Sequence, residues 1–377
     1  MAASVAVVMV AASSGAGYAG GGHHKHGPGP HHGDRISTVT DLSGPRGVES
    51  VRPGVTLVSE DDGSFSVVIE RHRRRAKVVE LGSLPGSAGF ANAVSTSRGK
   101  VYIVTGEGAP DTGAASLYVW DWRRRHQAPQ LLADIGAYQA SDPDPSDLED
   151  APEDSNPYDV LALRDGTVLV ADAAGNDLLR VWPSGNIKTV ARLMPRTVEV
   201  PDGLPDTDPD GNPLPPAGTP IPAEAVATSV TVGSDGYWYV GELRGFPATP
   251  GTSQIWRIRP GSTNAVCDPE ASTRSMHHSS CTKYADGLTS IVDLTADRHG
   301  GIYAVTLSKM SWLAMELGLP GADVGGLYQI RHHGHSIKEL VKDKLSLPGG
   351  ASVSKRGDIY VTGPVFGPGT LAKVSRR

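Results

Sequence analysis

One pattern of short strands recurs six times along this chain, and it constrains the fold more than any single residue does. The clearest copy spans residues 156–185: an apolar run, a glycine-containing turn, a second apolar run that ends in an acid, and a third strand. Related copies begin near residues 44, 89, 226, 287 and 347. Such a unit must stack against copies of itself to bury both faces, and repeats of this kind are typical of solenoids and propellers. We therefore predict an all-β fold, a six-bladed β-propeller.

The two ends of the chain predict how the ring closes. Residues 36–40 (ISTVT) alternate as a strand does, precede the first repeat and have no partner there. The last repeat, residues 347–374, shows only three strands. We expect the N-terminal strand to become the fourth, outer strand of the last blade, because closing the ring removes the exposed edges of an open array.

Composition agrees with a single propeller domain over residues 35–377. The chain has 377 residues, and 46 glycines and 29 prolines suit many short strands joined by tight turns. The formal net charge of −6 gives no electrostatic reason to expect binding to nucleic acid or to anionic membranes. We expect a monomer with no membrane span.

The N-terminus predicts export. Residues 2–12 are apolar or small, a run too short to span a bilayer but suited to a signal peptide over residues 1–19. No Lys or Arg precedes Lys25, so the usual basic start is missing, and a disordered cytosolic tail is the alternative. Residues 20–34 are rich in Gly, Pro and His and predict a disordered linker. The expected location is secreted, outside the cell.

The chain has two cysteines, Cys267 and Cys281. In an exported protein a local pair predicts a disulfide, which stabilises by roughly 3 kcal/mol for a loop of about 15 residues. The alternative is a metal site with His277 and His278, which lie between the cysteines. A second pair of the Cys-x-x-Cys type is missing, so the disulfide is favoured.

The repeat register predicts which polar side chains meet on one face, because second strands end and inner strands begin beside the central channel. Acids at the ends of second strands are Glu60, Asp172 and Glu242, with Glu107 two residues late. The expected ligand-binding residues at the inner-strand starts are Glu49, Asn92, Asn156, Asp159, Thr228, Asp286 and Thr289. Oxygen ligands without cysteine suit a hard cation such as Ca²⁺ far better than Zn²⁺. Alternatively, each acid caps the turn after its own strand.

A second calcium candidate lies in a proline-rich insertion. Asp206, Asp208 and Asp210, followed by Gly211, match the first half of a calcium loop. The position of the bidentate glutamate holds Ala217 instead, so an acidic turn is the alternative.

The sequence lacks the familiar catalytic and nucleotide-binding motifs. The sequence has no GxSxG, HExxH, Walker or GxGxxG motif, so no catalytic residue is assigned and an enzyme is the less favoured interpretation. Residues 309–323 have helical apolar spacing and predict a short helix over one rim.

The strings at residues 156–181, 226–261 and 287–294 resemble the ScyD/ScyE family, and the likeness runs from about Gly44 to Val374. The resemblance implies an exported, NHL-like propeller from a family named after proteins associated with biosynthesis of the sheath pigment scytonemin. It supplies no catalytic residues.

Three functions follow as hypotheses. The first is a non-catalytic propeller that binds a small molecule, a glycan or an envelope protein over its acidic, loop-bearing face. The second is a divalent-metal-dependent hydrolase, lactonase or lyase resembling SMP-30 and strictosidine synthase, with ligands from Glu49, Asn92, Asn156 and Asp286. The third is a structural protein of the cell envelope. Fold alone does not decide among them.

Overall fold

The computed structural model describes residues 34–86, 88–108, 112–207, 211–271, 279–331 and 334–375. The predicted signal peptide and all but the last residue of the predicted linker lie outside this part, as do Asp208 and Asp210 of the calcium-loop candidate. The alternative metal ligands His277 and His278 also lie outside it.

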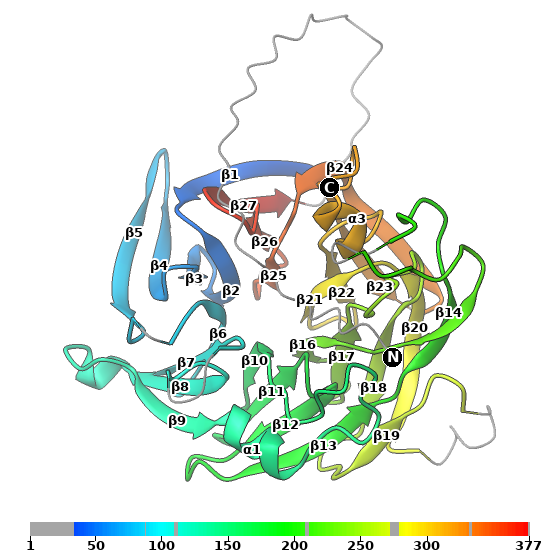
Figure 1. Ribbon diagram of the computed structural model, residues 1–377. Helices are drawn as coiled ribbons and strands as arrows, with labels where there is room; N and C mark the ends of the chain where they lie inside the picture. Colours follow the sequence, from blue (N-terminus) through cyan, green and yellow to red (C-terminus); the bar gives the residue numbers. More distant parts are fainter. Residues whose placement is uncertain are drawn as a thin grey trace, which may run out of the picture.

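Six antiparallel sheets surround a central axis, and each is one blade (Figure 1). The first three blades use consecutive strands from the centre outward. Blade 1 holds β2 (Pro45–Arg52), β3 (Val55–Glu60), β4 (Ser64–Arg71) and β5 (Arg74–Ser83). Blade 2 holds β6 (Ala91–Ser97), β7 (Lys100–Thr105), β8 (Ser116–Asp121) and β9 (Gln130–Asp134). Blade 3 holds β10 (Pro157–Ala162), β11 (Val168–Asp172), β12 (Asp177–Val181) and β13 (Ile187–Leu193).

The second half of the ring repeats the arrangement, and it confirms the predicted six blades. Blade 4 holds β16 (Ala227–Val232), β17 (Trp238–Glu242), β18 (Ser253–Ile258) and β20 (Cys281–Leu288). Blade 5 holds β21 (Ile291–Ala296), β22 (Ile302–Thr306), β23 (Val324–Arg331) and β24 (Ser336–Ser346). Blade 6 holds β25 (Gly350–Val353), β26 (Ile359–Gly363), β27 (Gly369–Ser375) and the N-terminal β1 (Arg35–Leu42).

The ring closes as the sequence predicts. Strand β1 pairs antiparallel with β27 from Arg35 opposite Ser375 to Leu42 opposite Gly369. The first and last described segments of the chain therefore share one sheet (Figure 1). Ile36 packs against the same apolar cluster as buried Val374 and Ile359, so closure adds side-chain burial to the backbone hydrogen bonds.

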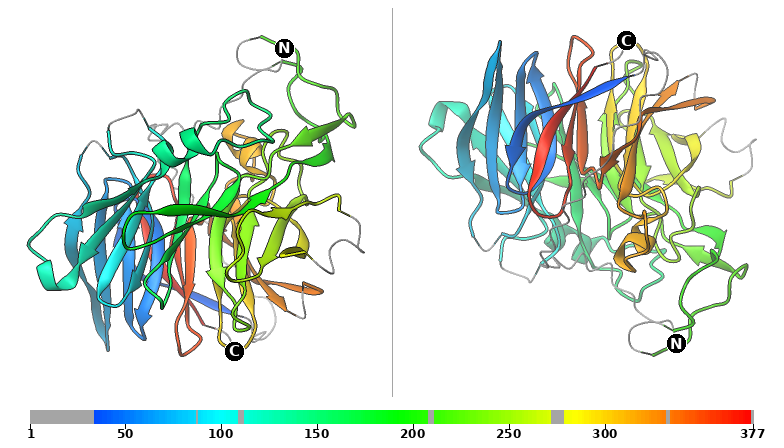
Figure 2. Two further views of the ribbon diagram at one scale, coloured as in Figure 1. Left: turned by 90° about the horizontal axis from the view of Figure 1, so that it is seen from below. Right: turned by 90° about the horizontal axis from the view of Figure 1, so that it is seen from above.

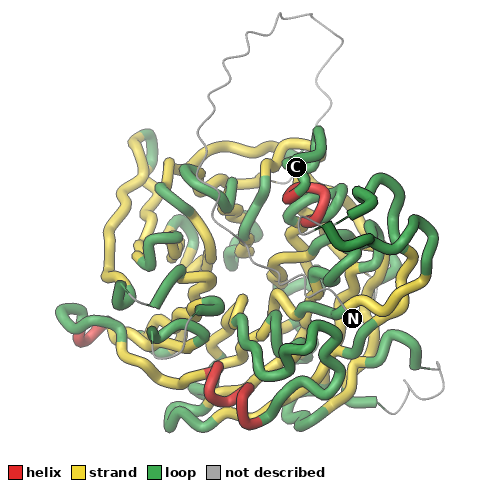
Figure 3. The backbone as a smooth tube through the Cα atoms, viewed as in Figure 1, coloured by secondary structure: helices red, strands yellow, loops and turns green. Residues whose placement is uncertain are grey.

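The loops on one side of the disc are the more elaborate. Helix α1 (Ile135–Ser141) follows β9, α3 (Trp312–Glu316) follows β22, and a hairpin of β14 (Arg196–Glu199) and β15 (Pro220–Ala223) leaves blade 3. Figure 2 shows all three on the same side of the disc, and Figure 3 shows how little helix the fold contains. The short helix predicted within residues 309–323 is confirmed, and it spans only Trp312–Glu316. We call this side the loop-bearing face.

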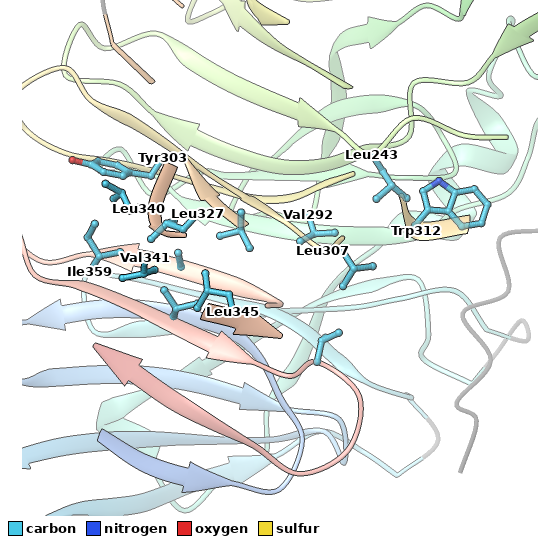
Figure 4. Close-up of a cluster of buried hydrophobic side chains, with 14 of the residues drawn as sticks. Leu243, Val292, Tyr303, Leu307, Trp312, Leu327, Leu340, Val341, Leu345 and Ile359 are labelled. Atoms are coloured by element: carbon cyan, nitrogen blue, oxygen red, sulfur yellow. The ribbon is translucent and has the colours of Figure 1, made fainter. Parts of the chain in front are cut away.

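The core lies between the blades. The cluster in Figure 4 joins β22 and β23 of blade 5 to β26 of blade 6 through Tyr303, Leu327 and Ile359, all fully buried. Trp312 of α3 belongs to the same cluster, and its indole Nε1 donates to the carbonyl oxygen of Arg244 at 2.8 Å. Helix α3 is therefore fixed to the rim by burial and by a hydrogen bond.

The predicted disulfide between Cys267 and Cys281 is present. Cys267 ends β19 (Ala265–Cys267), which adds a fifth, parallel strand to blade 3 beside β13. Cys281 begins β20, the outer strand of blade 4. The disulfide therefore joins the outer edges of two adjacent blades. In the described part of the chain, no helix has the length and apolar character needed to cross a membrane.

Candidate functional site

The inner strands of the blades are tied to one another around the channel. Each inner strand is an edge strand, since it pairs with only one neighbour within its sheet. At every junction between blades, a side chain of one inner strand bonds to the backbone of the next, with distances between 2.5 and 3.0 Å. In ring order the partners are Glu49–Thr96, Ser95–Ala162, Asp159–Val230, Thr228–Ile291, Asp293–Ala351 and Ser352–Ser50. We call these bonds the channel belt; they satisfy backbone groups that an edge strand otherwise leaves unpaired.

Three carboxyl groups of the channel belt have raised pKa values. Burial raises the pKa of Glu49 to about 7 and that of Asp159 to about 7. Burial and the nearby Asp159 raise the pKa of Asp293 well above its usual range. Their hydrogen bonds from backbone amides act in the opposite direction but do not outweigh the loss of solvent. These acids hold protons at a pH where exposed carboxyl groups are ionised.

The acids at the ends of second strands cap their own loops. Glu60 accepts hydrogen bonds from the backbone amides of Ser43 and Gly44. Asp172 accepts from the Ser155 hydroxyl and from two backbone amides, those of Asn156 and Gly175. The structure thus places these acids at equivalent strand ends, and each carboxylate accepts hydrogen bonds from residues of the adjacent loops.

Glu242, like Asp172, is a strand-end acid with no exposed surface. It is fully buried and forms an ion pair with Arg244, which is 1% exposed. Its carboxylate also accepts from the Gln254 amide at 3.0 Å and from the Trp256 indole at 3.1 Å. Arg244 in turn donates to the carbonyl oxygens of Ala223 and Glu224, so the pair fixes the base of the β14–β15 hairpin.

The second strands of blades 2 and 5 end in threonine, Thr105 and Thr306, and that of blade 6 ends in Gly363, with Thr362 one residue earlier. The hydroxyl of Thr105 bonds within its own loop, and that of Thr362 donates to the carbonyl oxygen of Arg46 in blade 1. Glu107 lies two residues past the strand end and is exposed. Partial loss of solvent around its carboxyl group and the nearby Asp154 raise its pKa.

Two of the predicted ligand-binding residues, Asn92 and Asn156, approach each other on the loop-bearing face. The Asn92 side chain donates to the carbonyl oxygen of Pro157 at 3.2 Å, and the Asn156 side chain accepts from the backbone amide of Glu107 at 3.2 Å. A Cβ at Gly106 would lie 2.6 Å from the Asn92 amide nitrogen and 3.0 Å from Asn156 Oδ1. Glycine is therefore what lets the two asparagines approach one backbone segment.

Other predicted residues lie elsewhere. Asp286 is on β20, the outer strand of blade 4, where its carboxylate pairs with Arg196 and Lys283. Thr289 lies between β20 and β21 and accepts a hydrogen bond from the amide of Gly251. Asp206 is exposed in the insertion between β14 and β15, where its carbonyl oxygen accepts from the amide of Leu214. Among the described residues, no group of three or more His, Cys, Asp or Glu is arranged to hold a metal ion.

An amide network anchors the acidic segment before β10. The Asn176 side chain donates to Asp144 at 3.0 Å and to Glu224 at 2.9 Å, and it accepts from the amide of Val226 at 2.7 Å. Glu224 also accepts from the amide of Leu148. Burial and neighbouring acids raise the pKa of Glu149 to about 7. The segment thus lies over the loop-bearing face with its buried acids bonded to amides.

Bulges at the starts of the inner strands define the mouth of the channel. In five blades the register with the second strand shifts there, and the extra residue falls at the start of the strand. The residues concerned are Arg46, Asn92, Tyr158, Thr228 and Val292. A bulge re-aims the side chain it carries, and a small cavity of about 30 Å³ below is lined by Asn92, Tyr158, Asp159, Val292 and Asp293.

Arg46 is the unusual member of this set. It is 9% exposed, and its guanidinium carbon lies 4.8 Å from the ring centre of Phe90 and 5.9 Å from that of Phe366. Within the described part of the chain its Nε is buried without a hydrogen-bond partner, and it forms no ion pair. Burial lowers its pKa, with Tyr158 and Asp61 acting in the opposite direction.

Sequence reasoning missed Arg46 and Tyr158. Both stand one residue after a proline that begins an inner strand, in GPRGV and NPYDV. A charged or phenolic side chain in that position of the repeat was the available signal. The β-bulge that turns it to the channel depends on pairing with the second strand and has no clear mark in the sequence.

Comparison with solved structures shows the fold. A gluconolactonase from Xanthomonas campestris matches with a TM-score of 0.53 at 13% identity, over 91% of this chain and 90% of that chain. The PQQ-bound aldose sugar dehydrogenase from Streptomyces coelicolor matches with a TM-score of 0.52 at 13% identity, over 92% and 100%. The calcium-binding protein regucalcin from Agrobacterium tumefaciens matches with a TM-score of 0.51 at 11% identity, over 92% and 95%. These likenesses support the six-bladed propeller fold.

No protein-family model matches the chain, and no curated protein matches its sequence. Likeness at these identities supports the architecture, and the function has to be argued from the residues at the channel mouth.

Proposed function

We propose that this protein is a ligand-binding propeller whose site is the channel mouth on the loop-bearing face. The observation that carries the proposal is an opening over the channel that residues of five blades line, among them Gly47, Asn92, Tyr158, Val292 and Gly350. Three of these residues, Asn92, Tyr158 and Val292, stand at inner-strand bulges. Sites built from residues distant in sequence on a rigid scaffold are typical of small-molecule recognition. Binding without catalysis fits the way the nearby acids are used, since Glu60, Asp172 and Glu242 all cap loops.

A divalent-metal-dependent hydrolase, lactonase or lyase is the second candidate. Its support is the meeting of Asn92 and Asn156 on one backbone segment, together with structural neighbours named as a gluconolactonase and a sugar dehydrogenase. The donor set expected from the sequence does not converge, however. Glu49 accepts from the amide of Thr96 in the channel, and Asp286 lies on outer strand β20, paired with Arg196. These residues do not fit one metal ion, so we derive no reaction from them.

The location and finer family of the protein are part of the same proposal. The disulfide between Cys267 and Cys281 supports an oxidising, extracellular location. The strings that resemble the ScyD/ScyE family support an exported propeller of that type. Calcium binding by the strand-end acids remains a proposal, and an unchanged melting temperature in millimolar Ca²⁺ and in chelator would remove it.

A thermal-shift screen tests the binding function. A mixed panel of neutral sugars, lactones, organic acids and amines is titrated against three proteins: the wild type, Tyr158→Ala at the mouth, and a variant of the opposite side, Arg98→Ala, in the turn between β6 and β7. A ligand of the mouth raises the melting temperature of the wild type and of Arg98→Ala but not of Tyr158→Ala. A panel in which every hit also stabilises Tyr158→Ala would contradict the proposal.

Hydrolysis of lactones and esters, assayed with and without Ca²⁺, separates binding from catalysis. Turnover of any of these compounds that is lost in Asn92→Ala or Asn156→Ala would favour the enzyme over the binding protein.

A further inference from the structure

The charge of Arg46 has no countercharge in contact with it. Its side chain is more than nine-tenths buried, yet in the described part of the chain it takes part in no ion pair and its Nε has no hydrogen-bond partner. Buried Arg244 is paired with Glu242, and partly buried Arg192 is paired with Asp142. Burying a charge costs free energy unless the charge is paired. An anion bound near the channel mouth would therefore stabilise the Arg46 guanidinium.

Tyr158 supplies a second donor close to the first. Its hydroxyl has no hydrogen bond to the described residues, and burial, with Asp293 and Asp159 nearby, raises its pKa to about 12. The hydroxyl therefore keeps its proton and can donate it to an acceptor. Phe366, whose ring centre lies 5.9 Å from the Arg46 guanidinium carbon, packs against the same apolar cluster as Tyr158. The charge of Arg46 correspondingly acts to lower the pKa of Tyr158. The guanidinium and the phenol both stand at bulges that begin inner strands, and together they are suited to a carboxylate.

The walls of the mouth select the rest of the ligand. Phe90, which is 38% exposed, and Phe366 flank the guanidinium. Blade 6 contributes Gly349 and Gly350 to the lining, so no side chain fills that sector. The cavity below has a volume of about 30 Å³, room for one or two water molecules. A ligand body must therefore lie at the mouth itself, against the aromatic rings.

Acidic residues near Arg46 limit how much negative charge a ligand can carry. Asp61 acts electrostatically on Arg46, while Asp159 and Asp293 lie in the channel below. The negative charge of Asp61 opposes a ligand with two or more charges, such as a phosphate, more than a ligand with one.

We propose that Arg46 and Tyr158 bind the carboxylate of a small organic monoanion with a flat, apolar body that packs on Phe90 and Phe366. The proposal rests on the binding function proposed above and narrows it to one chemical class. The carboxylate accepts hydrogen bonds from the guanidinium and from the phenol, and the body is stabilised by contact with the two rings.

Benzoate is the probe, and isothermal titration calorimetry of the full chain at pH 7.5 and low chloride is the measurement. Benzamide has the same ring without the charge, and inorganic phosphate has the charge without the ring. We expect benzoate to bind at least about tenfold more tightly than either, which corresponds to the usual gain from a charge-assisted pair. Arg46→Met should weaken benzoate binding by about tenfold or more, and Tyr158→Phe by about three- to tenfold.

Arg257→Met is the matched control, because Arg257 also stacks on an aromatic ring, that of Tyr237, but pairs with Asp235 at 2.9 Å. It should bind benzoate as the wild type does. Circular dichroism of each variant checks that the fold is intact, and Arg46→Lys provides a second test if Arg46→Met fails to fold, since it keeps the charge and should keep part of the affinity.

Equal binding of benzoate and benzamide, or undiminished binding by Arg46→Met, would overturn the proposal. So would the absence of benzoate binding by the wild type. If a neutral compound from the thermal-shift panel still bound at the mouth in that case, the general binding function would survive while the anion site would not.

Discussion

The side chain of Asp159 in blade 3 accepts a hydrogen bond from the backbone amide of Val230 in blade 4, with 2.7 Å between Oδ2 and the nitrogen. It also accepts from the amide of Val160 next to it in the chain. A buried acid thus joins two blades across an edge that no strand covers. The same device, with different side chains, recurs at all six junctions of the channel belt.

The raised pKa values in the channel predict that stability falls as pH rises through neutrality. The pKa of Glu49 is raised from 4.5 to about 7, and that of Asp159 from 3.8 to about 7. At pH values between the unfolded and the folded pKa, the folded chain holds protons that the unfolded chain has released. The free energy of unfolding therefore decreases as pH rises through this window. Urea denaturation between pH 5 and pH 8 should show this decrease.

Glu49→Gln provides the control for the pH dependence. Glutamine keeps an oxygen that can accept from the amide of Thr96, but it does not titrate. The variant should show a shallower decrease between pH 5 and pH 8. An identical slope in the variant and the wild type would show that this carboxyl group is ionised in the folded protein across the range.

Removing a strand-end acid should lower the free energy of unfolding most where the acid forms a buried ion pair. Glu242→Ala leaves Arg244 buried without its partner and removes the acceptor of two further donors, so we expect a loss of about 3–5 kcal/mol. Glu60→Ala removes an acceptor from two backbone amides without leaving an unpaired charge, and we expect about 1–2 kcal/mol. Urea denaturation of both variants measures the difference, and equal losses would contradict the structural roles assigned here.

The disulfide should act on the seam between blades 3 and 4. Replacing both Cys267 and Cys281 by serine should lower the free energy of unfolding by about 3 kcal/mol. Hydrogen exchange should quicken first in β19, because its three paired residues are the short outer edge of blade 3. Wild-type protein in reductant is the control and should behave in the same way. Uniformly faster exchange over all six blades would contradict a local role.

The repeat predicted the blades, their closure and the disulfide because these depend on patterns that each copy carries within itself. Contacts between copies could not be read in this way. The ties from Asp159 to Val230 and from Asp293 to Ala351 join residues 71 and 58 positions apart, and a register of aligned strands does not reveal them. Asp286 was expected at an inner-strand start because β20 and β21 are separated by only two residues, which made the end of one strand look like the beginning of the next.

Ring closure predicts a global effect of damage to a terminal strand. Ile36 lies opposite Val374 and packs against the core cluster between blades 5 and 6, so Ile36→Asp places a charge at the seam. Ser37, on the other face of the strand, is exposed, and Ser37→Ala is the matched control. We expect Ile36→Asp to lower the free energy of unfolding by about 2–4 kcal/mol with a single cooperative transition, because unpairing β1 exposes the edge of β27 and opens the ring.

Denaturation followed by tryptophan fluorescence measures this loss, since the six tryptophans report on blades far from β1. If Ile36→Asp melts at the same temperature as Ser37→Ala, β1 does not stabilise the ring, and the other strands keep it closed without β1.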